Sequence, residues 1–338
     1  MVQTMEKVEL GRTGRKVSQV SLGCMTMGTA TDVRTSARIL DAYLDDGGDF
    51  LDTANCYSWW VPGAAGGESE ELLGKLLKGR RDKVFLATKG SAAVADAESA
   101  RKGYHEDGTA DWDYIGRHFE GAGGDVIRRG VDESLRRLGT DHIDLYYIHV
   151  DDRATPLEET LSALDESVRA GKIRHIGWSN VRSWRLEQVR SLAERNGWAS
   201  PVAVQVQHSY LRPVADSASL ATGDMLDFLR GNEDIALAAY SSILRGIYDD
   251  SARRLAHPVW QTYAGADGEA RMAAVDAVAR EAGATGNQVA LAWLLRQTSP
   301  RVLPLIGPRT WEHYEAIRPA FTLELDASQL AVLDGAGA

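Results

Sequence analysis

Residues 125–149, DVIRRGVDESLRRLGTDHIDLYYIH, join a helix pattern directly to a strand pattern. In the first part, apolar residues recur at the spacing of one stripe of an α-helix: Val126, Ile127, Val131, Leu135 and Leu138. The last part, DLYYIH (144–149), is a short apolar run without clean polar alternation, which is typical of a strand covered on both faces in a parallel sheet. A helix that leads into such a strand indicates an α/β fold.

The same alternation extends along the chain in both directions from this stretch. Strands are predicted at residues 17–25, 49–54, 84–89, 144–149, 173–180, 202–207, 235–241 and 302–307. Helices are predicted at residues 37–47, 69–79, 125–139, 156–171, 183–196, 217–231, 271–283 and 287–298. Two long connections, 90–121 and 242–270, each follow a predicted strand, and connections of that length in compact domains are usually either functional or disordered.

Strands that alternate with helices in this number predict an α/β fold, the (β/α)8 TIM barrel. The alternative is a doubly wound sheet, but the chain has neither its GxGxxG fingerprint nor the phosphate-binding GxxxxGK[ST]. Gly11 and Gly14 lie between short β-type runs and predict an N-terminal β-hairpin that closes the bottom of the barrel. Extra C-terminal helices are expected after residue 310. Because no linker, repeat or low-complexity run divides the chain, we expect residues 1–338 to form a single domain.

Composition narrows the class of partner. The chain has 338 residues and a net charge of −10, which argues against nucleic acid or an anionic membrane surface as a partner. Cys24 and Cys56 form no CxxC, so we expect neither a metal site nor a redox motif, and sparse cysteine fits a reducing compartment. Without a signal-peptide core or an apolar run of about 18 residues, a cytoplasmic location is expected.

Four polar side chains lie at or just beyond the predicted strand ends. Asp52 lies near the end of the second strand, with Tyr57 shortly after it; Lys89 and His149 end the third and fourth strands. Each alone has an ordinary structural explanation. Asp52 could cap a turn, Tyr57 could be a packing aromatic, Lys89 could be a solvated strand end and His149 could be a core histidine. The C-terminal ends of barrel strands open onto one shared face, so we expect the four to meet there.

Together these four residue types suit proton transfer to a carbonyl oxygen. A nearby lysine ammonium is expected to lower the pKa of a tyrosine, which is about 10 in the free side chain. The aspartate keeps the lysine charged, and a neutral histidine can hold the carbonyl oxygen. This set therefore predicts reduction of a carbonyl by hydride, or the reverse oxidation of an alcohol, with the hydride coming from a cofactor.

Over nearly its whole length the chain resembles the aldo-keto reductases. The resemblance is carried by SLGCMTMG (21–28), DFLDTANCY (49–57), FLATKG (85–90), SLRRLGTDHIDLYYIH (134–149), TPLEETLSAL (155–164), GKIRHIGWSN (171–180), VQVQ (204–207), AAYSSILRG (238–246) and PLIGPRT (304–310). It is most similar to bacterial members of that family. The resemblance implies an NADP-dependent oxidoreductase in which Tyr57 is the proton donor and Asp52, Lys89 and His149 are its partners.

The resemblance also implies a cofactor site. Ser179, Asn180 and Gln205 would bind the nicotinamide carboxamide, and Tyr240 would stack on the ring. The other implied cofactor residues are Cys24, Met25, Ser241, Ile243, Gly246, Gly307, Arg309 and His313. Arg309 and a helix start near Thr310 suit a 2′-phosphate, so NADPH is the expected cofactor. The chain departs from the commoner family pattern at Ser242, His208, His313 and Ile317, which leaves NADH open as an alternative.

The expected partner is a small-molecule carbonyl substrate. Trp59 and Trp60 follow Tyr57 and are either loop packing or an aromatic wall for the substrate, and loop 90–121 is a potential lid. A sugar, a cyclitol, an antibiotic-like ketone and an aromatic aldehyde all fit. One alternative function is a cofactor-binding regulatory subunit with little turnover, similar to the potassium-channel β subunits. Another is a Schiff-base aldolase, which is disfavoured because a charged Lys89 is a poor nucleophile.

Overall fold

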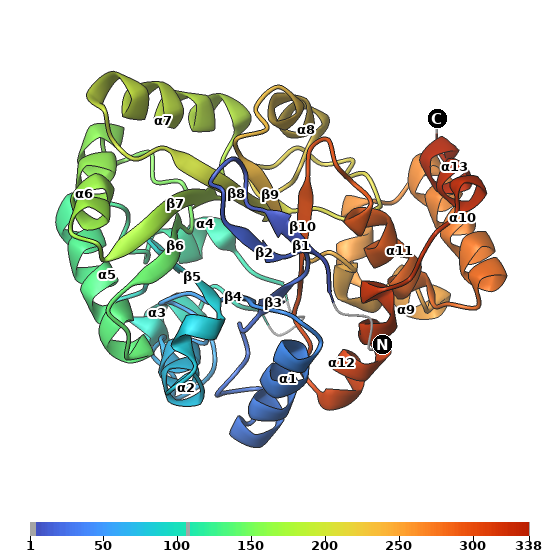
Figure 1. Ribbon diagram of the computed structural model, residues 1–338, viewed down its shortest axis with the longest axis horizontal. Coiled ribbons are helices and arrows are strands. Elements are labelled where there is room, and N and C mark those ends of the chain that lie inside the picture. The colour runs from blue at the N-terminus through green and yellow to red at the C-terminus, as the bar shows by residue number, and fades with distance from the viewer. Residues whose placement is uncertain (1–4, 106–108, 338) are drawn as a thin grey trace.

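The computed structural model describes residues 5–105 and 109–337, and its centre is a closed barrel of parallel strands (Figure 1). In pairing order the strands are β10 (Val302–Ile306), β3 (Ser21–Gly23), β4 (Phe50–Asp52), β5 (Phe85–Gly90), β6 (Ile143–Ile148), β7 (Ile173–Ser179), β8 (Pro201–Gln207) and β9 (Ala236–Tyr240). Parallel pairing of β10 with both β9 and β3 closes the ring. The predicted (β/α)8 barrel is confirmed.

The prediction of one strand at 17–25 is wrong, because the structure divides this segment between two sheets. Its first part belongs to β2 (Lys16–Ser18), which pairs antiparallel with β1 (Lys7–Glu9) in the predicted hairpin. The chain leaves the hairpin at Ser18, whose N–H donates to Asp49 Oδ1 at 2.7 Å, and only then enters β3. The hairpin closes one end of the barrel, since its apolar residues pack with inward-facing ones: Val8, Leu10 and Val17 with Phe50, Phe85 and Leu145.

Helices surround the barrel, and each predicted helix is present. They are α1 (Val33–Asp45), α2 (Glu68–Leu76), α5 (Gly124–Leu138), α6 (Leu157–Arg169), α7 (Ser183–Asn196), α8 (Gly223–Arg230), α10 (Ala266–Ala282) and α11 (Gly286–Leu295), followed by the extra C-terminal α12 (Trp311–Ile317), η4 (Arg318–Phe321) and α13 (Ala327–Gly335). Helix α8 begins later than predicted because Thr222 is its N-cap and accepts from the N–H of Met225. Before it, Leu220 bridges to Gln207 and is held out of the helix.

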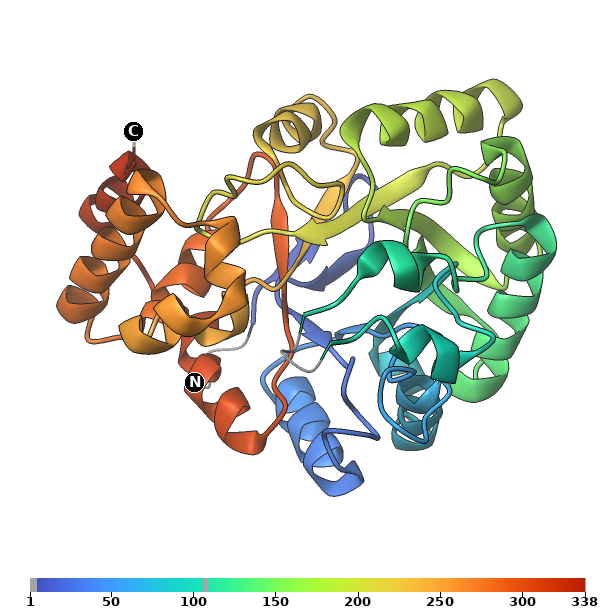
Figure 2. The same cartoon turned by 180° about the vertical axis from the view of Figure 1, so that it is seen from behind.

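Both long connections contain short helices in their described parts. Loop 90–121 contains α3 (Ala97–Arg101) and α4 (Trp112–Gly116), and loop 242–270 contains η2 (Leu244–Gly246), α9 (Ser251–Ala256) and η3 (Pro258–Thr262). The remaining short element, η1 (Arg81–Lys83), precedes β5. Figure 2 shows α3, α4 and α9 on the side of the barrel opposite the hairpin. Both loops therefore border the face on which the barrel strands end.

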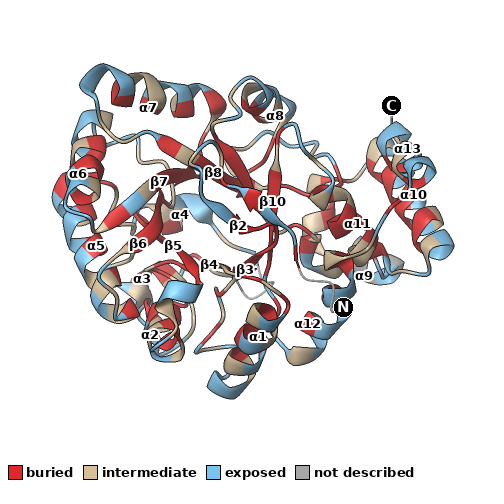
Figure 3. Cartoon of the chain, viewed as in Figure 1, coloured by how far each residue is buried: buried red, intermediate tan, exposed pale blue. Residues whose placement is uncertain are grey.

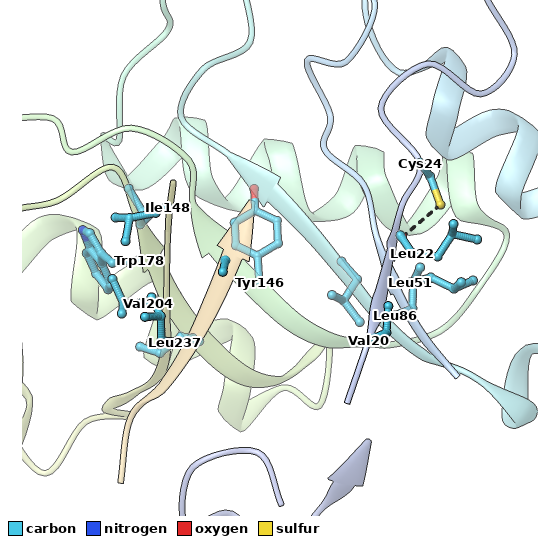
Figure 4. Packing of buried hydrophobic residues seen from close by; sticks show 14 of the residues in the cluster. Val20, Leu22, Cys24, Leu51, Leu86, Tyr146, Ile148, Trp178, Val204 and Leu237 are labelled. Carbon is cyan, nitrogen blue, oxygen red and sulfur yellow. Dashed lines mark hydrogen bonds between the residues drawn. The ribbon is translucent and has the colours of Figure 1, made fainter. Parts of the chain in front are cut away.

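The main hydrophobic core fills the space between the strands and the outer helices (Figure 3). Figure 4 shows its strand-borne residues, among them Leu22, Leu51, Leu86, Tyr146, Ile148, Trp178, Val204 and Leu237. Most are fully buried, so the strand ends are held on a close-packed support. Among residues 5–105 and 109–337, no helix is both long and apolar enough to cross a membrane.

Candidate active site

Four polar side chains from three neighbouring strand ends meet at the open end of the barrel. Asp52 is the last residue of β4 and Lys89 lies one residue from the end of β5. His149 directly follows β6, and Tyr57 comes from the loop after β4. The chain thus brings together all four residues that the sequence predicts to be catalytic.

Lys89 is the centre of this cluster. Its ammonium donates to Asp52 Oδ1 at 2.5 Å, to the Thr53 carbonyl at 2.8 Å and to the Tyr57 hydroxyl at 2.8 Å. An ammonium has three N–H donors, and all three are used. The Lys89 side chain is 0% exposed, and its ion pair with Asp52 is shielded from water. Removing charges from water is costly unless each is paired, so this geometry fixes the Lys89 position.

The second oxygen of Asp52 is held as well. Oδ2 accepts a hydrogen bond of 2.8 Å from the side-chain amide of Gln205, which lies on β8. The carboxylate is therefore fixed from two strands, and Gln205 is a member of the same buried network as Lys89. The amide nitrogen of Gln205 donates to Asp52 in this structure.

The pKa of Tyr57 differs in direction from the sequence expectation. Burial is the main cause that raises this pKa well above its ordinary value, and the nearby Asp52 carboxylate raises it further. The sequence-based prediction took account of the charge of Lys89 only. In the structure the negative charge of Asp52, which is paired with Lys89, offsets the effect of the ammonium on the pKa of Tyr57. The Tyr57 hydroxyl consequently stays protonated at neutral pH, and Lys89 can stabilise a phenolate only as it forms.

His149 is neutral and firmly placed. Burial, with a smaller contribution from the charge of Lys89, lowers the pKa of His149 well below its ordinary value. The backbone N–H of His149 donates to the Gly90 carbonyl, and its backbone carbonyl accepts from the Asn180 side chain, each at 2.8 Å. The imidazole ring packs edge-on to Tyr57, with the ring centres 5.6 Å apart. A neutral imidazole beside a protonated phenol can bind and protonate one oxygen atom.

Polar residues at the ends of β7, β8 and β9 extend this network. Asn180 has a left-handed backbone, φ 52°, which places its side chain beside Ser179 and the His149 carbonyl. The Tyr240 hydroxyl donates to Asn180 Oδ1 at 2.9 Å. Hydrogen bonds thus link the predicted nicotinamide residues to the cluster around Lys89; these are Ser179, Asn180, Gln205 and Tyr240.

Two further predicted cofactor residues follow β3 and differ in exposure. Cys24 is fully buried, and its thiol donates to the carbonyl of Leu22 (Figure 4). Its own N–H and carbonyl are bonded to Asp52 and Ser69, so Cys24 is built into the barrel wall. Met25 has 40% of its surface exposed and is the one of the two that is free to touch a ligand.

The loop after β9 has a backbone suited to anions. Ser241, Leu244, Arg245 and Gly246 all have positive φ angles, between 47° and 88°, and the half-buried Ile243 lies among them. N–H groups in such conformations can form concavities that bind phosphate oxygens. Two N–H groups of this loop are already used, because Leu244 and Gly246 donate to the carbonyls of Ser241 and Ile243. The Ser242 hydroxyl, where the family pattern commonly has proline, donates to the Leu305 carbonyl and fastens this loop to β10.

The remaining predicted cofactor residues lie after β10. Gly307, Arg309 and His313 are all exposed, and the Arg309 carbonyl accepts from the Thr31 hydroxyl at 3.0 Å. Sequence reasoning missed Arg38 on α1, whose guanidinium lies over the Trp311 ring, 3.8 Å from its centre. Neither Arg38 nor Arg309 has an ion-pair partner in the described part of the chain. No local signal could reveal Arg38, because α1 and α12 meet only in the folded chain.

Trp59 and Trp60 belong to a row of aromatic rings that begins at Tyr57. Successive ring centres are 6.3 Å apart for Tyr57–Trp60, 6.0 Å for Trp60–Trp59, 5.8 Å for Trp59–Tyr104 and 6.1 Å for Tyr104–Trp112. The row runs from the buried cluster to Trp112, which is 62% exposed. Arg101 on α3 fixes the loop by donating to the Trp59 carbonyl at 2.9 Å. We call the five ring-bearing residues the aromatic row; they are Tyr57, Trp60, Trp59, Tyr104 and Trp112.

A cavity of about 620 Å³ lies between the loops that follow β7 and β8. Trp184, Val214 and Met225 supply its apolar lining, and Arg182 pairs with Asp216 at its edge. None of the four clustered residues lines it. It is therefore separate from the candidate active site.

Comparison with known proteins identifies the family. The model of the Aldo/keto reductase family matches residues 19–338. The uncharacterized oxidoreductase YrpG of Bacillus subtilis is 34% identical over 98% of this chain and 95% of its own. An aryl-alcohol dehydrogenase of Pestalotiopsis microspora is 27% identical over 94% and 78% of the two chains, respectively. In structure, the chain is similar to the thermostable aldo-keto reductase Tm1743, with a TM-score of 0.71, 28% identity and coverage of 98% and 99%. The chain therefore belongs to the aldo/keto reductase family, whose members are nicotinamide-dependent oxidoreductases that act on carbonyl compounds.

Proposed function

We propose that this protein reduces an aldehyde or ketone to the alcohol with NADPH, and that Tyr57 donates the proton. The observation that carries the proposal is the buried contact of Lys89 with both Asp52 and the Tyr57 hydroxyl. A phenol held against a fixed ammonium can protonate an oxygen as negative charge develops on it.

The roles of the four residues follow from this arrangement. When bound, the nicotinamide cofactor supplies the hydride. The Tyr57 hydroxyl gives its proton to the substrate oxygen, and Lys89 stabilises the phenolate that remains. Asp52 holds Lys89 in place, and the neutral His149 ring binds the same substrate oxygen. A substrate would reach these groups from the open end of the barrel, where Tyr57 and His149 are only partly buried.

The described residues fit such a cofactor, and they favour NADPH over NADH. We assign the carboxamide to Asn180 and Gln205, whose side-chain amides are held in place because they donate to the His149 carbonyl and to Asp52. The positive-φ loop 241–246 offers N–H groups for the pyrophosphate. Arg309, together with Arg38 over Trp311, supplies unpaired cations at the adenosine end. A chain of net charge −10 repels a polyanion in general, so these two cations are expected to select for the extra phosphate.

The aromatic row supports a ring-bearing carbonyl compound as substrate. It offers successive ring faces and edges next to the Tyr57 hydroxyl, and aromatic rings pack well against flat or cyclic apolar groups. One relative, the aryl-alcohol dehydrogenase of Pestalotiopsis microspora, is named for an aromatic substrate. We therefore place an aromatic aldehyde or ketone first, ahead of a sugar, a cyclitol or another cyclic carbonyl.

The regulatory alternative is less favoured. A subunit that only binds cofactor has no need of a fully satisfied Asp52–Lys89–Tyr57 cluster, which costs desolvation of two charges.

We propose that the whole chain is one catalytic domain that acts in the cytoplasm, as the sequence predicts.

A panel assay tests the proposal. Loss of NADPH absorbance is followed with aromatic aldehydes, aromatic ketones, sugars and cyclitol ketones, and the product alcohol is identified. Turnover is expected, with the highest kcat/KM for the aromatic carbonyls, and Trp60→Ala should reduce that preference about tenfold relative to an open-chain aldehyde. Trp184→Ala, beside the separate cavity, is the matched control and should leave the preference unchanged. Cofactor binding without turnover of any carbonyl would refute the proposal.

A further inference from the structure

Cys56, the residue before Tyr57, makes a contact that no role described above requires. Its sulfur lies 3.3 Å from Nδ1 of His149, within hydrogen-bond reach for sulfur. Cys56 is 4% exposed, and the backbone of His149 is already fixed on both sides by Gly90 and Asn180. The thiol therefore faces one definite atom of the imidazole ring, whose other side packs edge-on to Tyr57.

The direction of this hydrogen bond follows from the protonation states. Burial raises the pKa of the Cys56 thiol to about 12, so the sulfur carries its hydrogen at neutral pH. The lowered pKa of His149 leaves its ring neutral, with one N–H and one bare nitrogen. A bare imidazole nitrogen is a good acceptor, whereas a thiol sulfur is a weak one. The favoured arrangement therefore has the S–H donating to Nδ1.

We propose that Cys56 is a positioning residue that selects the tautomer of His149 in which Nε2 carries the hydrogen. In that tautomer the Nε2–H is free to donate to the substrate oxygen, because no hydrogen bond to Nε2 occurs within residues 5–105 and 109–337. In the other tautomer Nε2 would present a lone pair and repel that oxygen. The inference rests on the proposed function for its catalytic consequence, but the tautomer itself does not depend on turnover.

Nitrogen NMR of the full chain labelled with ¹⁵N-histidine tests the tautomer directly. The ring signals of His149 are assigned by their loss in His149→Gln. Wild-type protein should show a protonated Nε2 and a bare Nδ1. Cys56→Ala should show a mixture of the two tautomers, whereas Cys56→Ser retains a donor and should stay close to wild type. Cys24→Ala is the matched control: it removes another buried thiol, one that donates to Leu22, and should not move the His149 signals.

Kinetics of the same variants test the consequence. Cys56→Ala should lower kcat about two- to tenfold with the dissociation constant for NADPH unchanged, and Cys56→Ser should recover most of the loss. A wild-type ring protonated at Nδ1, or a Cys56→Ala ring with the wild-type tautomer, would overturn the inference. If Cys56→Ala shifts the tautomer but the wild-type chain reduces no carbonyl, the pairing stands and the proposed function fails.

Discussion

The ammonium of Lys89 and the hydroxyl of Tyr57 are 2.8 Å apart, and that ammonium has no donor left for any other group. The proposed proton donor, Tyr57, and the cation proposed to stabilise its conjugate base, Lys89, are therefore in contact before any ligand arrives. Preorganised dipoles and charges of this kind need no rearrangement during the reaction, which is where enzymes gain most of their electrostatic stabilisation.

Replacing Tyr57 by phenylalanine should remove the proton donor and keep the ring. We expect kcat for carbonyl reduction to fall by about 10²–10⁴, the range typical of a lost general acid. The dissociation constant for NADPH, measured by fluorescence titration, should change little. Tyr114→Phe, which removes a hydroxyl bonded to the Ser99 carbonyl in loop 90–121, is the control and should keep wild-type turnover. Wild-type rates in Tyr57→Phe would show that another group supplies the proton.

The buried ion pair makes a separate prediction about stability. Lys89→Met leaves the Asp52 carboxylate buried without its cation, so the free energy of unfolding should fall by about 3–5 kcal/mol. Adding Asp52→Asn removes the orphaned charge and should recover most of that loss, although activity stays absent. Denaturant unfolding of the two variants measures both effects. A double variant no more stable than Lys89→Met would mean that the charges are not coupled as the structure indicates.

The barrel, and the meeting of the four polar residues at its open end, could be predicted from the sequence because their signals are local. Each strand is a short apolar run, and Asp52, Lys89 and His149 lie at strand ends, which a barrel brings to one face. The division of 17–25 could not be predicted, because Val17 and Leu22 both continue the same apolar pattern. Only the pairing of Val17 with Val8 separates them into two sheets.

What the sequence could not show is which side chains meet across distant elements. The contact of Arg38 with Trp311 and that of Cys56 with His149 join positions far apart in the chain. The pKa of Tyr57 likewise depends on burial, which is a property of the folded chain, and not on the presence of Lys89 alone. These contacts and this burial cannot be predicted from the composition of the chain or from the spacing of its residues.

Arg38 should contribute to the choice between NADPH and NADH. If its guanidinium, held over Trp311, contacts the 2′-phosphate, Arg38→Ala should weaken NADPH binding about tenfold and leave NADH binding unchanged. Arg34→Ala, one turn earlier on α1, is the matched control. Titration of both cofactors at low and moderate salt checks the effect, which should shrink as salt rises. Equal losses for the two cofactors would place Arg38 away from the phosphate.

Buried His208 predicts that stability declines in mild acid. Burial lowers the pKa of His208 to about 4, whereas the unfolded chain binds this proton near the ordinary value of 6.5. Stability from this group is therefore present above about pH 6.5 and is lost as pH falls toward 4, by about 3 kcal/mol. Thermal unfolding from neutral pH to pH 4 should show this slope, and His208→Asn should flatten it. The exposed His313 is a control whose replacement should leave the slope unchanged.

The pH dependence of turnover should separate the two directions of the reaction. In the proposed mechanism, reduction needs a protonated Tyr57 and a neutral His149. The pKa of Tyr57 is shifted upward and that of His149 downward, so both forms are present at least between the ordinary pKa values of 6.5 for histidine and 10.0 for tyrosine. The kcat for reduction should therefore be nearly flat over that range. Oxidation of the alcohol needs the Tyr57 phenolate as base, so its rate should rise with pH throughout. A reduction rate that falls between about pH 7 and 8 would show that, in the loaded enzyme, the charge of Lys89 outweighs the burial of Tyr57.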